Sequence, residues 1–201
     1  MATYSVNSDN QKHGHYTTYF ENGQKRSEGE YVNGKQVGVW YCWYENGAQV
    51  NIGNYGEDGL ETGEWKFFYP SGKLQQINHF AFGKANGEFI DYYESGKIKR
   101  KGNTTKEILN GADKEFDENG ILSNERIYKN GVLDGAFKEY ATNGKIVRSG
   151  NWNDSVPIGD FFEYDTINGN ILQKTFIYKG GKPSDTTITY KDNKPCGKLI
   201  Y

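Results

Sequence analysis

Short runs of aromatic and other apolar residues alternate along the chain with polar turns that contain glycine. In the stretch Gly38–Gly63, Trp40 and Trp43 follow the leading glycine, and the dipeptide Asn46-Gly47 comes next. The same unit restarts every 24 or 25 residues, at Gly14, Gly38, Gly63, Gly87, Gly111, Gly135 and Gly159. A period this regular is typical of a repeat array.

Two positions of the unit carry aromatic residues. The sixth position is aromatic in every unit, and the third is aromatic except at Asp113. In a regular strand these two positions fall on opposite faces. Two arrangements follow from this: a twisted ribbon that buries one face, or a bulge that re-aims one of the rings. The spacing alone leaves both open.

Each unit is predicted to be one β-hairpin. A turn dipeptide separates two strand-like runs, and Asn-Gly in this context is a strong hairpin signal because both residues tolerate positive φ. These turns are Asn22-Gly23, Asn46-Gly47, Ser71-Gly72, Ser95-Gly96, Asn119-Gly120, Asn143-Gly144 and Asn168-Gly169. The second strand runs to another aromatic residue, which is Tyr31, Tyr55, Phe80, Tyr128, Trp152 or Tyr178. A second turn then closes the unit, as at Asn33-Gly34, Asp58-Gly59, Asn130-Gly131 and Gly180-Gly181.

The sequence therefore predicts an all-β protein, an elongated single antiparallel sheet of consecutive hairpins with about 14 to 17 strands. Helices are not expected, because the turn glycines leave no uninterrupted window of helical periodicity. We expect a partial N-terminal repeat over 1–13, seven hairpin repeats over 14–184, and an incomplete C-terminal repeat over 185–201. In that last region single strands are expected over 186–190 and 198–201.

Composition and charge narrow the function classes. With 24 basic and 26 acidic residues the formal net charge is -2, so nucleic acid is not an expected partner. The chain has neither a run of about 18 apolar residues nor the features of a signal peptide at its start, and the default expectation is a cytoplasmic protein. Cys42 and Cys196 lie in repeats that are far apart, and we expect both to be free thiols.

The unit resembles the MORN-repeat variant of bacterial proteins, many of which are described as YwqK-type antitoxin components. The resemblance rests on segments such as Gly38–Gly47 and Tyr31–Gly38 and extends from about Gly14 to Gly197. It implies an extended sheet of hairpins, a solenoid-like scaffold for protein–protein contact, and in eukaryotic relatives membrane association. Thr104 and Asp113 depart from the aromatic pattern, and the sheet is expected to bend or loosen between them.

Candidate catalytic chemistry is sparse. His13 and His15 are two residues apart and could in principle bind a metal, but no cysteine or third histidine is near them in sequence. The spacing of the three histidines suggests no nucleophile–histidine pair. The glycines recur as hairpin turns and form no phosphate-binding loop. We expect no enzyme, no metal and no cofactor.

Two rows of side chains are candidate binding surfaces. The fifth position becomes acidic in the later units, at Asp91, Glu115, Glu139 and Glu163, with about 10 Å expected between neighbours. This row is either an acidic stripe for a basic partner or a solvated face balanced by lysines such as Lys114 and Lys138. The seventh position carries Tyr44, Tyr69 and Tyr93, which are either core residues or, with Tyr41, anchors of an interface.

The leading hypothesis is a non-catalytic repeat protein that binds another protein, such as an antitoxin-like or immunity-like partner of a co-encoded effector. The alternative is a scaffold that contacts a membrane surface or a glycan through its aromatic rows, although the charge balance lacks the basic patch that anionic lipids favour.

Overall fold

The computed structural model describes residues 1–167, 169–177, 183–191 and 193–200. These residues form strands and turns, with no helix among them. The strands are β1 (Ala2–Thr3), β2 (Gly14–Tyr19), β3 (Lys25–Val32), β4 (Lys35–Trp43), β5 (Gln49–Tyr55), β6 (Glu61–Phe68), β7 (Leu74–Ala81), β8 (Lys84–Tyr92), β9 (Ile98–Thr105), β10 (Ile108–Leu109), β11 (Gly111–Phe116), β12 (Leu122–Lys129), β13 (Val132–Tyr140), β14 (Ile146–Asn153), β15 (Val156–Tyr164), β16 (Ile171–Ile177), β17 (Pro183–Lys191) and β18 (Lys194–Ile200).

The predicted fold class is confirmed: the strands belong to one open antiparallel sheet built from consecutive hairpins. The described residues contain 18 strands, slightly more than expected, because the two-residue strands β1 and β10 also pair. Parts of three predicted features lie outside the described residues: Asn168 of one turn, Tyr178 with the turn Gly180-Gly181, and Tyr201 of the last strand. The domain boundaries at 13 and 184 stay predictions.

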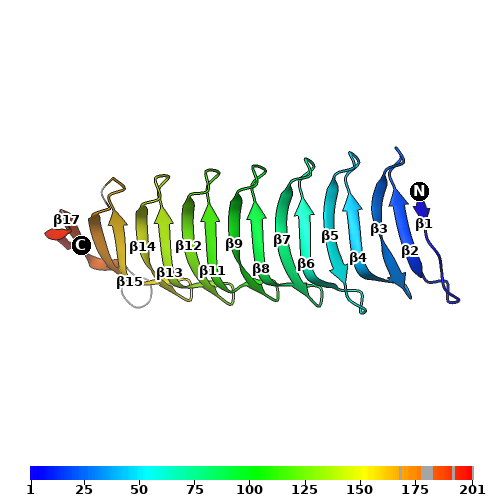
Figure 1. The fold of residues 1–201 in the computed structure, drawn as a ribbon. Helices are drawn as coiled ribbons and strands as arrows, with labels where there is room; N and C mark the ends of the chain where they lie inside the picture. The colour runs from blue at the N-terminus through cyan, green and yellow to red at the C-terminus, as the bar shows by residue number, and fades with distance from the viewer. Residues whose placement is uncertain (168, 178–182, 192, 201) are drawn as a thin grey trace. The chain divides into compact units, whose positions relative to one another are not determined.

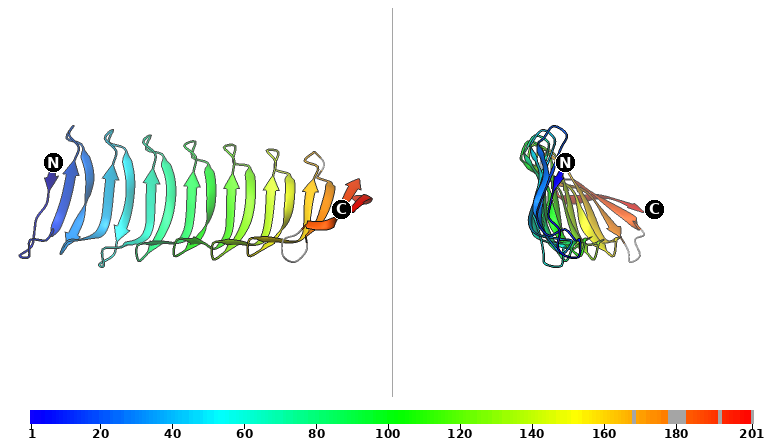
Figure 2. Two further views of the ribbon diagram at one scale, coloured as in Figure 1. Left: turned by 180° about the vertical axis from the view of Figure 1, so that it is seen from behind. Right: turned by 90° about the vertical axis from the view of Figure 1, so that its right-hand side faces the viewer.

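The chain divides into two compact units. The first contains residues 1–98 and 104–107, and the second contains 99–103 and 108–201. In the first unit, Figure 1 shows the hairpins β2–β3, β4–β5 and β6–β7 side by side, coloured blue to green, and the view from behind in Figure 2 shows the same order. Thr104 belongs to the first unit and Asp113 to the second. A bend between these two residues stays a prediction.

A bulge on the second strand of the hairpin shifts the register next to the sixth-position ring. In the β4–β5 hairpin, Cys42 pairs with Asn51 but Trp43 pairs with Gln49, so that Val50 is the extra residue. The same shift follows the fifth position in the hairpins that begin at β2, β6, β11, β13 and β15. Of the two arrangements that the spacing left open, the structure contains the bulge.

A second bulge, between successive hairpins, places the third-position ring. Glu28 pairs with Tyr41 and Glu30 pairs with Val37, so Gly29 alone stands opposite the three residues from Gly38 to Trp40. Gly38 has a φ of 66°, in the left-handed region that glycine enters without strain. The leading glycine of the unit therefore lets the strand bulge and directs the following indole onto the preceding hairpin.

The third-position rings form the centre of the core. The side chain of Trp40 is 4% exposed, and its indole occupies the space in which a Cβ atom at Gly29 would stand. Trp65 lies over Gly53 in the same way, and Phe137 and Phe161 both contact the open face of Gly150. A ring of one hairpin thus packs on a glycine of the hairpin before it.

Second-strand aromatics alternate with these rings in an edge-to-face ladder. In the first unit, the centroid distances are 5.1 Å for Tyr31–Trp40, 6.2 Å for Trp40–Tyr55 and 5.2 Å for Tyr55–Trp65. In the second unit, Trp152 lies 6.0 Å from Phe137 and 5.9 Å from Phe161. Such pairs contribute about 0.5–1.5 kcal/mol each beyond the area that they bury. The strands of the described residues belong to one sheet, so the ladder supplies packing between hairpins that a second sheet would otherwise give.

Candidate functional site

The predicted tyrosine anchors lie half-buried on the sheet, and two of them connect successive hairpins. The Tyr44 hydroxyl donates to the backbone oxygen of Phe68 at 2.9 Å, and the Tyr69 hydroxyl donates to that of Tyr92 at 2.7 Å. Tyr41 stacks on Trp43 with a centroid distance of 5.8 Å and an interplanar angle of 15°. Tyr44 and Tyr69 thus combine partly exposed rings with a structural hydrogen bond.

The turn asparagines have a similar second role. Asn46 donates from Nδ2 to the backbone oxygen of Pro70 at 2.9 Å, in the next hairpin, and Asn143 donates to that of Thr166 at 2.7 Å. The sequence predicted these residues only as turn formers. The side chains of Asn46 and Asn143 also tie their turns to the turn of the next hairpin.

Three of the four predicted carboxylates have hydrogen-bond partners, and their arrangement as a row stays a prediction. Asp91, in the first unit, accepts from Gln76 Nε2 at 2.7 Å. In the second unit, Glu115 accepts from Arg126 at 3.2 Å and Glu139 accepts from Arg148 at 2.7 Å, whereas Glu163 is exposed. The balancing cations for Glu115 and Glu139 are arginines on the paired strands. The lysines that we singled out lie elsewhere: Lys114 pairs with Glu125 at 2.6 Å, and Lys138 stands across the ladder from Glu125.

Asp113 replaces a core ring with a buried carboxylate. Its side chain is 2% exposed, and Oδ1 accepts from Arg100 Nε at 2.7 Å. Oδ2 has no hydrogen-bond partner among the described residues. A pocket of about 140 Å³ next to Asp113 is lined also by Arg126 and Phe137, which fits the loss of an aromatic ring at this position.

Contacts among Lys114, Glu125 and Tyr140 in the second unit shift two pKa values. Hydrogen bonds from Lys114 and from the Tyr140 hydroxyl, which lies 2.6 Å from Glu125 Oε2, lower the pKa of the Glu125 carboxyl. Burial, together with the hydrogen bond to Glu125, raises the pKa of Tyr140 to about 12. Both shifts move the groups away from neutral pH, where a general acid or base would need to titrate.

The histidines take part in local contacts. His15 lies 3.0 Å from Glu30 and 3.1 Å from Thr17, and the His13 ring accepts from the backbone N–H of Asn33 at 3.4 Å. Within the described ranges, no group of three His, Cys, Asp or Glu side chains is arranged to hold a metal ion. Cys42 and Cys196 are both free, and burial raises the pKa of the Cys42 thiol.

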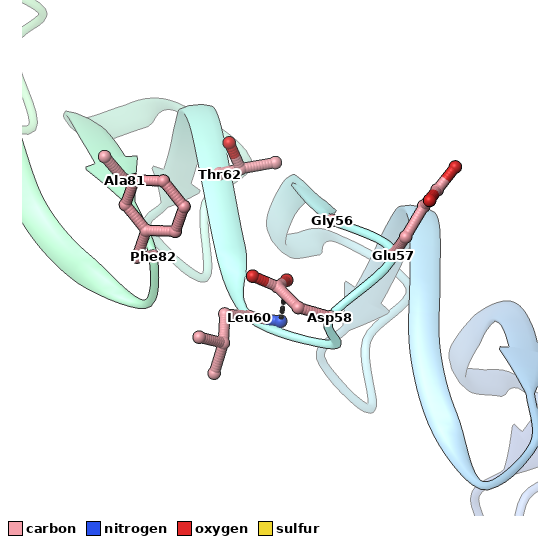
Figure 3. A pocket seen from close by; sticks show the side chains of 7 residues that line it. All are labelled: Gly56, Glu57, Asp58, Leu60, Thr62, Ala81 and Phe82. Carbon is pink, nitrogen blue, oxygen red and sulfur yellow. Dashed lines mark hydrogen bonds between the residues drawn. The ribbon is translucent and has the colours of Figure 1, made fainter.

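A surface pocket that the sequence analysis did not identify lies between two turns of the first unit. Its volume is about 360 Å³, and Figure 3 shows Ala81 and Phe82 on one side and Asp58, Leu60 and Thr62, from the loop and β6, on the other. Leu60 is 43% exposed and Phe82 is 78% exposed. Asp58 Oδ1 accepts from the backbone N–H of Leu60 at 3.0 Å, which fixes the loop over 56–60.

The turn Phe82-Gly83 has the same backbone shape as other turns of the chain, but phenylalanine is an unusual residue at its first position. Phe82 has a φ of 53° and Gly83 a φ of 73°. The values are close to those of Asn33 (48°) with Gly34 (81°) and of Asn130 (50°) with Gly131 (83°). Two positive φ values define a type I′ turn, whose first position favours Asn, Asp or Gly. A bulky residue at positive φ is strained. The Gly83 N–H donates to the Glu61 backbone oxygen at 3.0 Å, which brings this turn beside Leu60.

A comparison with known families matches segments that each contain one hairpin. The family model described as "MORN repeat variant" matches residues 12–33, 61–81, 85–106, 109–130 and 133–154, which is more than half of the chain. The chain belongs to the MORN repeat variant family. The stretch Gly38–Leu60 lies outside the matched residues, although its strands β4 and β5 form the same kind of hairpin as the matched MORN repeats.

Other comparisons add no function to the MORN repeats. No curated protein matches the chain. Solved structures that it resembles include "Crystal Structure of TcdB2-TccC3", with 11% identity and a TM-score of 0.24, and "Crystal Structure of TcdB2-TccC3-TEV", with 12% identity and a TM-score of 0.25. Each match covers 94% of this chain and 13% of the other chain. No helix in the described part of the chain is long and apolar enough to span a membrane.

Proposed function

We propose that this MORN repeat protein is a non-catalytic module that binds another protein. The observation that carries the proposal is Phe82: a large apolar ring, 78% exposed, at a turn position whose backbone geometry favours asparagine. The turn requires a positive φ at this position but does not require a phenylalanine there. Strained residues of this kind cluster at functional sites. An exposed aromatic beside an exposed leucine provides a rigid apolar anchor for an interface.

The partly exposed rings of Tyr41, Tyr44, Tyr69 and Tyr93 extend the surface that a partner could contact. Asp91, Glu115, Glu139 and Glu163 would orient a partner by charge, although the cations beside Glu115 and Glu139 weaken their individual fields. An antitoxin-like or immunity-like role beside a co-encoded effector is the specific form of the proposal. It rests on the resemblance to bacterial MORN repeats.

Co-expression with the products of neighbouring genes tests the proposal. The tagged chain, the variant Phe82→Asn and the control variant Val32→Ser are each purified with the candidate partner and analysed by size-exclusion chromatography with light scattering. Val32 is another exposed apolar residue, at 44%. We expect a complex with the native chain and with Val32→Ser, and weaker or no complex with Phe82→Asn.

Two results would overturn the protein-binding proposal. One is that no neighbouring product forms a complex with the native chain, while flotation with vesicles or a glycan array gives saturable binding. The other is that Phe82→Asn retains the complex unchanged. For the antitoxin-like form, the native chain must also relieve the growth defect caused by the co-encoded effector.

A further inference from the structure

The pocket beside Phe82 combines an apolar pair with acidic groups. Leu60 and Phe82 supply the apolar surface, and Figure 3 shows the Asp58 carboxylate on the side of the loop that faces Phe82, with Glu57 pointing away. The Glu61 carboxylate lies at the Phe82-Gly83 turn, because Oε2 would stand 3.4 Å from a Cβ atom at Gly83. Two carboxylates therefore flank the exposed Phe82 ring and the Leu60 methyl groups.

Nearby lysines balance this acidity only in part. The Lys84 ammonium lies 3.6 Å from Glu107, so its charge is already engaged. The stem of Lys35 contacts the loop at Gly59, where a Cβ atom would stand 3.1 Å from Lys35 Cβ. Among the described residues, none of Glu57, Asp58 and Glu61 forms an ion pair with a lysine, arginine or histidine.

We propose that this pocket binds a short segment of a partner protein in which an apolar side chain is flanked by Lys or Arg. The inference rests on the proposed function and names the chemistry of the partner. A volume of about 360 Å³ is at the small end of ligand pockets, which suits one or two side chains of such a segment. Its apolar side chain lies between Leu60 and Phe82, and its cations face Asp58 and Glu61.

Other occupants fit the charges less well. An anionic membrane surface repels carboxylates at the rim of the pocket. A second copy of this chain in a two-fold contact would bring the same acidic pocket against itself, since an isologous interface uses one patch twice. A segment with an apolar side chain and flanking cations can cover the Phe82 ring and also pair with the carboxylates.

The sequence explains why the pocket occurs at this place. The loop over 56–60 is longer than the two-residue turns at 33–34, 82–83 and 130–131, and it brings Asp58 and Leu60 toward the neighbouring turn. At 33 and 130 the first turn residue is asparagine, whereas here it is Phe82. The long loop and the aromatic turn adjoin each other only because their hairpins are consecutive.

Fluorescence anisotropy with three labelled peptides tests the inference on the full chain. Each peptide has a short Gly-Ser frame around a core of Lys-Leu-Lys-Leu-Lys, Glu-Leu-Glu-Leu-Glu or Lys-Ser-Lys-Ser-Lys. We expect the first to bind at least about tenfold more tightly than the other two, a difference of about 1.4 kcal/mol. Its affinity should fall at high salt, because screening shortens the reach of exposed charges.

Variants locate the binding site. Phe82→Asn and Glu61→Gln should each weaken binding of the Lys-Leu peptide, by about tenfold for Phe82→Asn, while Val32→Ser should leave it unchanged. Equal binding of the Glu-Leu peptide would overturn the charge requirement and leave the protein-binding proposal standing. Equal binding to Phe82→Asn would overturn the site itself. Saturable binding to phosphatidylserine vesicles, or Phe82-dependent dimers in sedimentation, without peptide binding would assign the pocket to another occupant and refute the inference.

Discussion

The indole of Trp40 on β4 occupies the space that a Cβ atom at Gly29 on β3 would need. Trp65 and Gly53 repeat this relationship one hairpin later. In each pair the aromatic residue follows a bulge at the leading glycine, and the buried glycine belongs to the preceding hairpin. The packing between successive hairpins therefore depends on a tryptophan in one hairpin and a glycine at the facing position of the hairpin before it.

Gly29→Ala should destabilise the protein by about 1–3 kcal/mol, because the added methyl overlaps the Trp40 indole and forces a well-packed ring to move. Chemical denaturation followed by tryptophan fluorescence measures the change. In a Trp40→Leu background the same substitution should cost less, since the smaller side chain leaves room, and the double-mutant cycle isolates the coupling. Equal costs in both backgrounds would show that the indole does not pack on Gly29.

Tyr44→Phe should cost about 0.5–1.5 kcal/mol of stability. The substitution keeps the ring but removes the hydroxyl that donates to the Phe68 backbone oxygen at 2.9 Å. Tyr41→Phe is the matched control, because Tyr41 contributes a ring stack with Trp43. Thermal unfolding should show a lower midpoint for Tyr44→Phe and little change for Tyr41→Phe; the reverse order would contradict the role of the hydroxyl.

Alkaline pH should destabilise the second unit through Tyr140. Its pKa in the folded protein is raised from 10.0 to about 12 by burial and by Glu125. The contribution is therefore fully present below pH 10 and is lost as the pH rises toward 12, because the unfolded chain releases the proton first. Unfolding midpoints measured across this window should fall more steeply for the native chain than for Tyr140→Phe. Parallel curves would contradict the shift.

Acid pH should also destabilise the second unit, through Glu125 in the same cluster. The pKa of Glu125 is lowered from 4.5 by its hydrogen bonds with Lys114 and Tyr140, so its contribution is present above pH 4.5 and is lost as the pH falls through the folded pKa. Glu125→Gln should reduce the dependence of the unfolding midpoint on pH below 4.5.

The Arg100–Asp113 pair should be replaceable by apolar residues. Arg100→Leu alone leaves Asp113 buried without its donor and should cost about 3–5 kcal/mol. The double variant Arg100→Leu/Asp113→Phe restores the ring that the other units carry at the third position and should be at least as stable as the native chain. Urea denaturation of the three proteins decides the question; a double variant less stable than Arg100→Leu would show that the site does not accept a ring.

Much of the fold follows from the sequence because its determinants are local. Asn-Gly turns such as Asn46-Gly47 and the alternating strands around them mark each hairpin without reference to distant residues. The bulges do not follow, since an extra residue such as Val50 changes the pairing without altering the apolar pattern. The recurrence of glycine at 29, 53, 102 and 150 could have predicted where the ring of the next hairpin packs. A ring contacts the glycines at 29, 53 and 150, and Gly102 is buried at the corresponding position.

The candidate pocket could not be predicted from turn rules alone. A search for Asn-Gly and Asp-Gly passes over Phe82-Gly83, although an aromatic at this position of a type I′ turn is itself an anomaly once the register is known. Cross-strand partners depend on register in the same way. The donors to Asp91 and Glu139 are Gln76 and Arg148, which become neighbours only after the bulges have set the pairing.

The central claim is that Phe82 serves contact with a partner and not the fold, and the stability of Phe82→Asn tests it most directly. Asparagine adopts the positive φ of this turn with less strain, and little packing is lost because the ring is 78% exposed. Urea unfolding should therefore show a gain of about 1 kcal/mol with unchanged circular dichroism. A loss of about 1 kcal/mol or more would show that the ring stabilises the fold, and would contradict the claim.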